Sequence, residues 1–266
     1  MYYNKYRLLF TGAGSYDADA QTYFTAAGIT DAGHKSAWNT FVLDCKANGN
    51  WTPLIAAYPV IGGTSGTHAI NAKTPGTYNL TFTGITHSSS GITGNGTTNN
   101  VDTGIQPSTA FSSNINVHYC FYTSTYTVTS TAISDMGAFN STNNFLDFGV
   151  YGTSPNTVPR AGMFHTTIVN AATNAGLNNG VWIAQDSGSN LTFYKNGGSI
   201  APGSIGTKSA LANLTGTIRL TCRANNAGTI SRRSNKIYGF FSIGTVLGNA
   251  AAYSTAVQNL QTALGR

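Results

Sequence analysis

An alternating run in the middle of the chain constrains the fold more than any other feature. Residues 114–122 read Asn-Ile-Asn-Val-His-Tyr-Cys-Phe-Tyr, with neither glycine nor proline. Ile115, Val117, Tyr119 and Phe121 would share one face, because successive side chains of a strand point to opposite sides of a sheet. The run therefore predicts a strand with one buried face, in a sheet that needs a second layer packed against it.

Similar short runs recur between residues 62 and 248, separated by turns rich in Gly, Asn, Ser and Thr. The sequence Asn196-Gly197-Gly198 is a hairpin signal. The glycine-rich stretch 91–96 is interpreted as a turn. Many short strands joined by such turns predict a mainly β sandwich or jelly roll. The further strands expected are Tyr78–Phe82, Val101–Ile105, Phe145–Val150, Gly162–Val169, Gly180–Ala184, Leu191–Lys195, Thr217–Arg223 and Lys236–Ile243.

The two ends of the chain have a different pattern. Residues 1–15 form an aromatic arm, and residues 16–61 predict short amphipathic helices, the last of them carrying Leu54, Ile55 and Tyr58 inward. Residues 249–266 predict a C-terminal helix, whose apolar stripe recurs at helical spacing. We expect all of these helices to pack on the sandwich, because each stripe is too narrow to form a domain alone. The C-terminal stripe consists of Tyr253, Val257, Leu260 and Leu264.

Charge is scarce and unevenly spread. Charged residues make up 8% of the 266 residues, and the net charge is +6. Residues 187–266 contain eight bases and no acid, which predicts a positive surface that suits an acidic protein neighbour. Nucleic acid is not expected, because aromatic residues are not interleaved with the bases. The alternative is a solubility charge without a dedicated partner. The predicted protein-contact patch consists of Arg219, Arg223, Arg232, Arg233 and Lys236.

Other candidate sites are weaker. Tyr122, Trp182 and Tyr194 would offer stacking faces to a glycan, although aromatic residues in strands more often belong to the core. The five histidines are scattered without metal-ligand spacing, so no metal is expected. Calcium is conceivable at a rim loop with Asn99, Asn100 and Asp102, where an Asx-turn is the alternative. No cofactor is predicted.

No targeting or membrane segment is expected. The first ten residues contain too short an apolar run for a signal peptide, and no run approaches the roughly 18 apolar residues of a membrane span. Three cysteines leave one unpaired in any disulfide scheme, and they have no metal-binding spacing. Free thiols of this kind suggest folding in a reducing compartment.

Several short motifs together resemble a known family. They include Asp-Ala-Asp-Ala-Gln at 17–21, Tyr-Pro-Val-Ile-Gly-Gly at 58–63, Thr-His-Ser-Ser-Ser at 86–90 and Tyr-Lys-Asn-Gly at 194–197. From about residue 16 onward, the chain resembles structural proteins of tailed phages and prophages with a concanavalin A-like or laminin-G-like jelly roll. The resemblance implies a virion component assembled in the host cytoplasm: a head fibre, spike, decoration or tail-associated protein. Its partners would be other virion proteins, copies of itself and host surface glycans.

The acids limit the chemistry. All eight are Asp, and the chain contains no Glu. Glycosidases of this fold resemble one another in a Glu-X-Asp-X-X-Glu strand, which cannot exist here, and Asp135 and Asp147 lack catalytic spacing. We therefore predict no catalytic residue and a protein that is not an enzyme.

The first functional hypothesis is a virion structural and adhesion protein. The second is a carbohydrate-binding module of a bacterial surface or secreted protein. A polysaccharide-degrading enzyme is the third, least supported class.

Overall fold

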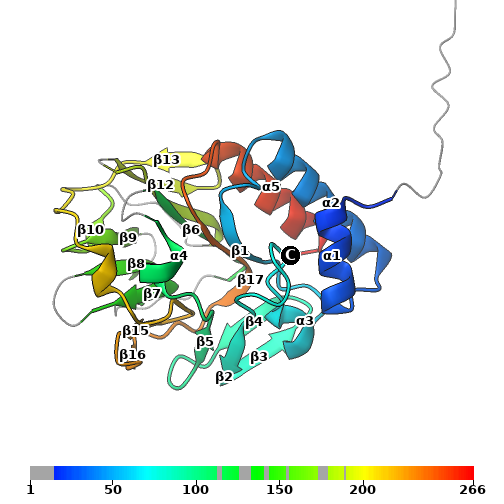
Figure 1. The fold of residues 1–266 in the computed structure, drawn as a ribbon, viewed down its shortest axis with the longest axis horizontal. Helices are drawn as coiled ribbons and strands as arrows, with labels where there is room; N and C mark the ends of the chain where they lie inside the picture. The colour runs from blue at the N-terminus through cyan, green and yellow to red at the C-terminus, as the bar shows by residue number, and fades with distance from the viewer. Residues whose placement is uncertain are drawn as a thin grey trace, which may run out of the picture.

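The computed structural model describes residues 15–112, 116–125, 133–140, 144–153, 156–172, 179–188 and 190–266. Two largely antiparallel sheets pack face to face, with helices along one side (Figure 1). The predicted mainly β sandwich is confirmed. Residues 1–14 of the predicted arm, and Asn114 and Ile115 of the alternating run, lie outside the described residues.

The alternating run contributes the central strand of the first sheet. In this strand, β6, Val117, Tyr119 and Phe121 face the other sheet, as predicted. In its described residues the sheet has the order β13 (Gly198–Ile200), β12 (Leu191–Lys195), β11 (Gly180–Asp186), β6 (Val117–Thr123), β17 (Ile237–Gly244), β4 (Gly91–Gly94) and β3 (Ile85–Ser88), with β1 (Leu54–Tyr58) paired to β17.

The second sheet lies opposite the first. Its long hairpin partners, β8 and β9, pair over nine registered positions from Phe145↔His165 to Thr153↔Asn156. In the described part of the chain its order is β10 (Val169–Asn170), β9 (Asn156–His165), β8 (Phe145–Thr153), β7 (Met136–Phe139), β14 (Arg219–Leu220), β5 (Asn100–Asp102) and β2 (Thr81–Thr83), with β15 (Arg223–Asn225) and β16 (Ile230–Ser231) at its side.

Helices cover the outer face of the first sheet. A second apolar cluster joins Trp38 and Phe41 of one helix and Tyr253 of another to Phe240 and Ile183 of the sheet. The C-terminal stripe is confirmed, and among the described residues no helix is long and apolar enough to cross a membrane. The helices are α1 (Ala18–Ala27), α2 (Ala32–Ala47), α3 (Ser65–Ala69), α4 (Pro107–Ala110) and α5 (Ala250–Ala263), with a 3₁₀ turn at Leu211–Asn213.

The helical interpretation of residues 54–58 is wrong, because they form β1. Ala56 and Tyr58 point into the sandwich, whereas Leu54 and Ala57 point toward the helices. A strand buried on both faces reads as a continuous apolar run, which has no period of two to distinguish it from a buried helix.

Two glycine-rich stretches have different outcomes. Asn196 and Gly197, with φ of 48° and 86°, form the two-residue turn of the predicted β12–β13 hairpin. By contrast, the predicted turn at 91–96 contains strand β4. A Cβ at Gly91 would lie 2.1 Å from the carbonyl oxygen of Tyr238, so glycine is needed where β17 passes close to β4.

A buried ion pair joins the two sheets. Lys236, directly before β17, places its Nζ 2.9 Å from both carboxylate oxygens of Asp135, which precedes β7. The same ammonium donates to the carbonyl oxygen of Val150 at 2.7 Å, and the Tyr238 hydroxyl donates to Asp135. Both members of the pair are fully buried. The charges of the Asp135 carboxylate and the Lys236 ammonium therefore balance each other inside the sandwich.

Removing one member of this pair should be costly. We expect Lys236→Met to lower the free energy of unfolding by about 3–5 kcal/mol, because Asp135 would remain as an uncompensated buried charge. The double variant Asp135→Leu/Lys236→Met should recover most of that loss. Urea unfolding measures both, with Lys35→Met on α2 as a control expected to change stability by less than about 0.5 kcal/mol. Equal losses in the single and double variants would contradict the assignment.

His118 is a buried neutral histidine on the helix-covered face of β6. Its Nδ1 donates to the carbonyl oxygen of Thr245, so its Nε2 is the acceptor for the Ser242 hydroxyl at 3.2 Å. Burial lowers the pKa of His118 from its usual 6.5 to about 4, against the opposing effect of the Thr245 contact.

This burial predicts sensitivity to acid. Between pH 6.5 and pH 4 the unfolded chain binds a proton at His118 that the folded protein does not, so stability falls as the pH falls through this window. The loss at pH 4 should be about 3 kcal/mol for this group. Unfolding measured across the window should give a shallower pH slope for His118→Gln than for the native protein. Identical slopes would show that His118 is already charged in the folded state.

Candidate functional site

The predicted glycan residues lie on two different faces. Trp182 is fully buried between the sheets, whereas Tyr122 and Tyr194 are half-buried beside the helices. Trp182 as a stacking face is therefore wrong, because its ring belongs to the core and successive residues of β11 point in opposite directions. Tyr122 and Tyr194 remain a prediction.

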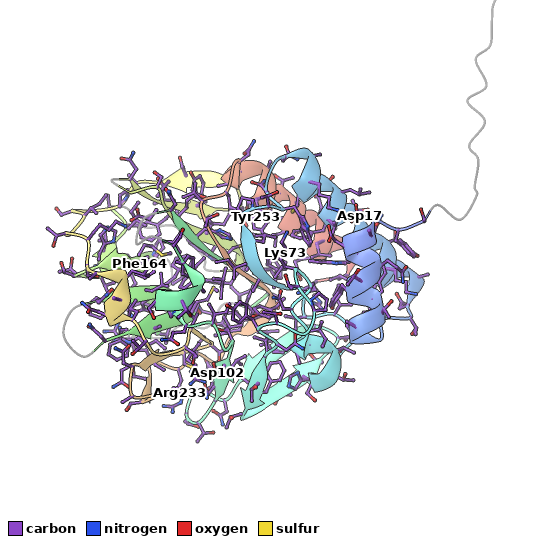
Figure 2. All side chains as sticks on the ribbon, in the orientation of Figure 1. Asp17, Lys73, Asp102, Phe164, Arg233 and Tyr253 are labelled. Atoms are coloured by element: carbon purple, nitrogen blue, oxygen red, sulfur yellow. The ribbon has the colours of Figure 1, made fainter. Side chains whose placement is uncertain are left out.

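The predicted basic patch is not a patch of free cations. Lys236 is inside the sandwich, Arg223 pairs with Asp147, and Arg219 pairs with Asp102. Arg233, which is labelled in Figure 2, donates through Nε to the carbonyl oxygen of Asn99 at 3.2 Å. The prediction of a contiguous protein-contact surface is wrong for the paired bases, because their charges are compensated within the chain.

The outer face of the second sheet carries a cluster of charged and aromatic side chains. Along β8, Leu146, Phe148 and Val150 enter the core, so the alternate residues point away from it. The cluster, which we call the arginine face, consists of Phe139, Phe145, Asp147, Tyr151, Arg160 and Arg223.

Asp147 is at the centre of the arginine face. Its Oδ2 lies 3.1 Å from Nη1 of Arg223 and 3.8 Å from Nη2 of Arg160. Arg160 also donates to the carbonyl oxygen of Ile133 at 3.2 Å. Burial raises the pKa of Asp147, against the opposing effect of Arg223 and of the nearby Arg232. The carboxylate therefore fixes the two guanidinium groups against the sheet.

Each guanidinium lies over an aromatic ring. That of Arg223 is 4.3 Å from the centre of the Phe139 ring and 5.7 Å from that of Phe145. That of Arg160 is 5.1 Å from the centre of the Tyr151 ring. All three aromatic side chains are partly exposed, so flat apolar surfaces and fixed N–H donors lie side by side.

Glycines on both neighbouring strands make room for this arrangement. Gly137 of β7 and Gly162 of β9 are the register partners of Asp147. A Cβ at Gly137 would lie 2.7 Å from Oδ1 of Asp147 and 2.9 Å from Cβ of Arg223. The side chains of Asp147 and Arg223 therefore occupy the space over the sheet that a larger residue would fill.

The candidate calcium loop is occupied by protein contacts. The buried amide of Asn99 donates to Thr221 and Ser234, and its Oδ1 accepts from the backbone of Gly96. Asn100 and Asp102 both face Arg219. Within the described ranges no group of three His, Cys, Asp or Glu side chains is placed to hold a metal.

Two histidine contacts were missed by the search for sequence spacing. His68 and His87 approach through their Nδ1 atoms at 3.0 Å, although they are 19 residues apart. His165 lies 3.3 Å from Asp186, whose carboxylate is 2.7 Å from Nζ of Lys208. Burial lowers the pKa of His165 to about 4, so this buried group is neutral. Both contacts join distant segments, for which local spacing gives no signal.

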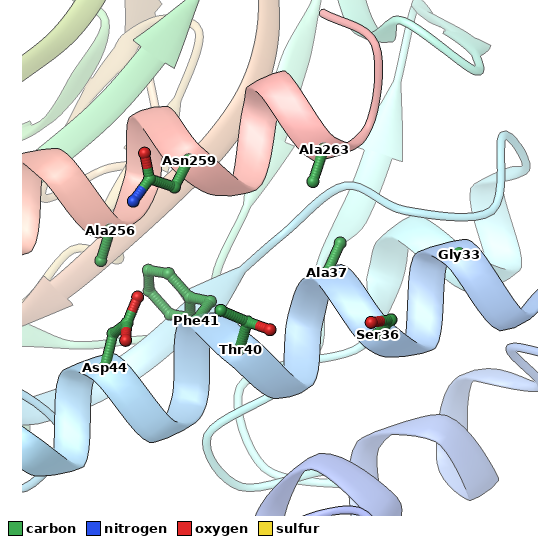
Figure 3. Close-up of a pocket in the computed structure, with 9 residues that line it drawn as sticks. All are labelled: Gly33, Ser36, Ala37, Thr40, Phe41, Asp44, Ala256, Asn259 and Ala263. Atoms are coloured by element: carbon green, nitrogen blue, oxygen red, sulfur yellow. The ribbon is translucent and has the colours of Figure 1, made fainter. Parts of the chain in front are cut away.

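A groove of about 440 Å³ lies between α2 and α5 (Figure 3). Its walls are mostly small side chains, and Asp44 is the single charged residue among those lining it. The groove is lined by small apolar and polar side chains, whereas the arginine face combines ring surfaces with oriented donors. The lining consists of Gly33, Ser36, Ala37, Thr40, Phe41, Asp44, Ala256, Asn259 and Ala263.

We take the arginine face as the candidate site because its aromatic rings are partly exposed, although Arg160 and Arg223 are only 5% and 8% exposed. Aromatic rings bind the apolar face of a flat ligand, and guanidinium groups donate hydrogen bonds in a fixed fork. Sequence analysis singled out Arg223 and Asp147 but missed Phe139, Tyr151 and Arg160. The signal available in the sequence was the alternation of apolar and other residues in the strands that contain Gly137 and Gly162.

Comparison with known proteins shows the fold. No family model and no curated protein sequence matches the chain. A Trypanosoma rangeli sialidase mutant displaying trans-sialidase activity has a TM-score of 0.57 at 9% identity, over 86% of this chain and 40% of its own. Domain 4 of AbnA, an extracellular GH43 arabinanase of Geobacillus stearothermophilus solved with arabinotriose, has a TM-score of 0.53 at 13% identity. The match covers 77% of this chain and 98% of that domain.

These similarities overturn the prediction that the protein is not an enzyme. That prediction rested on the absence of Glu and of one glucanase-like motif. Sialidases share the fold over most of this chain, so the architecture occurs in enzymes that the motif does not represent. The chain spans about two fifths of the sialidase chains it matches.

The glycine beside Asp147 gives a direct test of the site. We expect Gly137→Ala to lower the free energy of unfolding by about 1–3 kcal/mol, because the added methyl group would displace Asp147 and Arg223. Chemical denaturation measures the loss. Gly66→Ala in α3 is the matched control, since a Cβ there meets nothing within 4 Å. A Gly137→Ala protein as stable as the control would contradict the close approach.

Proposed function

We propose that the protein binds carbohydrate through the arginine face. The observation that carries the proposal is the stacking of Arg223 over Phe139 and of Arg160 over Tyr151, with all four side chains on one side of one sheet. A sugar ring has an apolar face for an aromatic side chain and hydroxyl groups around its edge for polar partners. The arginine face offers both kinds of contact within one small area.

The fold supports this proposal. The arabinanase domain, which this chain matches over nearly the whole of that domain, was solved with an arabinose trisaccharide. The sialidases of the same fold were solved with sialic acid and its analogues. The ligands of these structural neighbours therefore support a carbohydrate ligand for this chain, and we assign it to the arginine face.

The virion role implied by the phage resemblance stays a prediction, as do assembly with other virion proteins, self-association and virion localisation. The proposed glycan binding needs none of them. It fits a phage adhesion protein as well as a carbohydrate-binding module of a bacterial surface or secreted protein. The two settings differ in where the protein is found, which co-purification with particles would decide.

Aromatic substitution tests the proposal. A glycan array identifies a ligand, and titration calorimetry compares the native protein with Phe139→Ala and Tyr151→Ala. We expect each substitution to weaken binding about tenfold, equal to 1.4 kcal/mol, through loss of a stacking surface. Circular dichroism confirms that the variants remain folded.

Tyr194→Ala is the matched control, because Tyr194 is a half-buried aromatic residue on the first sheet. It should leave the affinity unchanged. Loss of binding in Tyr194→Ala, with full binding in Phe139→Ala and Tyr151→Ala, would move the site to the face that carries Tyr122 and Tyr194. A glycan array on which no glycan binds the protein would overturn the proposal.

A further inference from the structure

Building on the proposed glycan binding, we infer that the arginine face selects sugars that carry a carboxylate. Two arginines contact one acid there, since Arg160 and Arg223 both pair with Asp147, and the half-buried Arg232 adds positive charge that acts on the same carboxylate. Two positive charges therefore remain without an acidic partner. A ligand carboxylate is the group that a planar guanidinium fork matches best.

Two guanidinium groups also have unused donors. Within the part of the chain that the structure describes, the Nε of Arg160 and the Nη1 of Arg232 are buried without a hydrogen-bond partner, as are the Oδ1 of Asp147 beside them and the Nε of Arg219 elsewhere. Arg160 as a whole is only 5% exposed. Buried donors without acceptors are rare in folded proteins, because each costs about 1–3 kcal/mol. An acceptor arriving with a ligand would remove that cost at Arg160, whose other nitrogen already contacts Ile133.

The protein has no other acid to supply these acceptors. All eight acids lie in the described residues, and the four in the sandwich each have a base as partner. Asp17 and Asp19 pair with Lys46. Asp31 caps α2, and Asp44 lines the groove between α2 and α5. A further carboxylate at the arginine face would therefore come from a ligand.

Neutral and acidic forms of the same sugar separate charge recognition from stacking. The probes are trigalacturonate and its methyl ester, and sialyllactose and lactose, titrated into the full-length protein. We expect at least one acidic probe to bind about tenfold or more tightly than its neutral partner. Raising the salt from 50 to 500 mM should weaken binding of the acidic probe and leave the neutral one unchanged, because salt screens the attraction between an anionic ligand in solution and the arginines.

Two adjacent arginines provide a matched pair of variants. Arg232→Gln and Arg233→Gln remove the same charge from neighbouring half-buried positions, but Arg233 is directed to the backbone of Asn99. Arg232→Gln should reduce the preference for the acidic probe about threefold or more, and Arg233→Gln should not. Thermal unfolding of both variants shows whether they keep the native fold.

The outcomes distinguish the two proposals. Equal binding of acidic and neutral partners, lost in Phe139→Ala, would overturn the carboxylate preference and leave carbohydrate binding intact. An equal effect of both arginine substitutions would overturn the role of Arg232 and the local charge argument with it. Failure of every glycan to bind would overturn both proposals together.

Discussion

Pairs between aspartates and bases determine how this sandwich closes. In the described residues, four of them join an acid from residues 102–186 to a base from residues 208–236, a further one joins Asp147 to Arg160, and the deepest, Asp135–Lys236, lies between the two sheets. A buried ion pair adds little stability over an apolar substitute, but a single buried charge without its partner is very costly. Every alternative packing that separates these residues therefore carries a penalty of several kcal/mol. Half of the eight bases in residues 187–266, which give the sequence its asymmetric charge, are used for this closure.

The same pairs fix the register of the second sheet. Asp147 lies between Gly137 and Gly162, and its neighbours in β8, Leu146 and Phe148, are core residues. A shift of one residue would turn Asp147 into the core and the two apolar residues to the outside. It would also move Asp147 away from Gly137, which leaves room for Arg223. Apolar alternation and ion pairing therefore specify the same alignment of strands.

The sequence predicted features that depend on local pattern. The turn at Asn196-Gly197, the stripe on α5 and the inward face of β6 needed only neighbours in the chain. It failed where burial removed the pattern, as in β1, and where glycines served close packing, as in β4. The candidate site was hidden for another reason: Asp147, Arg160 and Arg223 are brought together by pairings across three strands. Composition showed the excess of bases but could not show which of them would pair with an aspartate.

Whether a base is fully compensated by an acid distinguishes the structural pair at Asp135 from the candidate site at Asp147. At Asp135 one ammonium, one hydroxyl and a backbone amide donate to one carboxylate. The single positive charge of Lys236 balances the single negative charge of Asp135. At Asp147 the carboxylate contacts two guanidinium groups that lie over partly exposed rings, Arg232 adds charge nearby, and among the described residues the Nε of Arg160 has no acceptor. A purely structural pair gains nothing from surplus positive charge, because repulsion between the arginines opposes folding. The surplus is what the fold alone does not explain, and binding of an external acceptor is the simplest physical reason for retaining it.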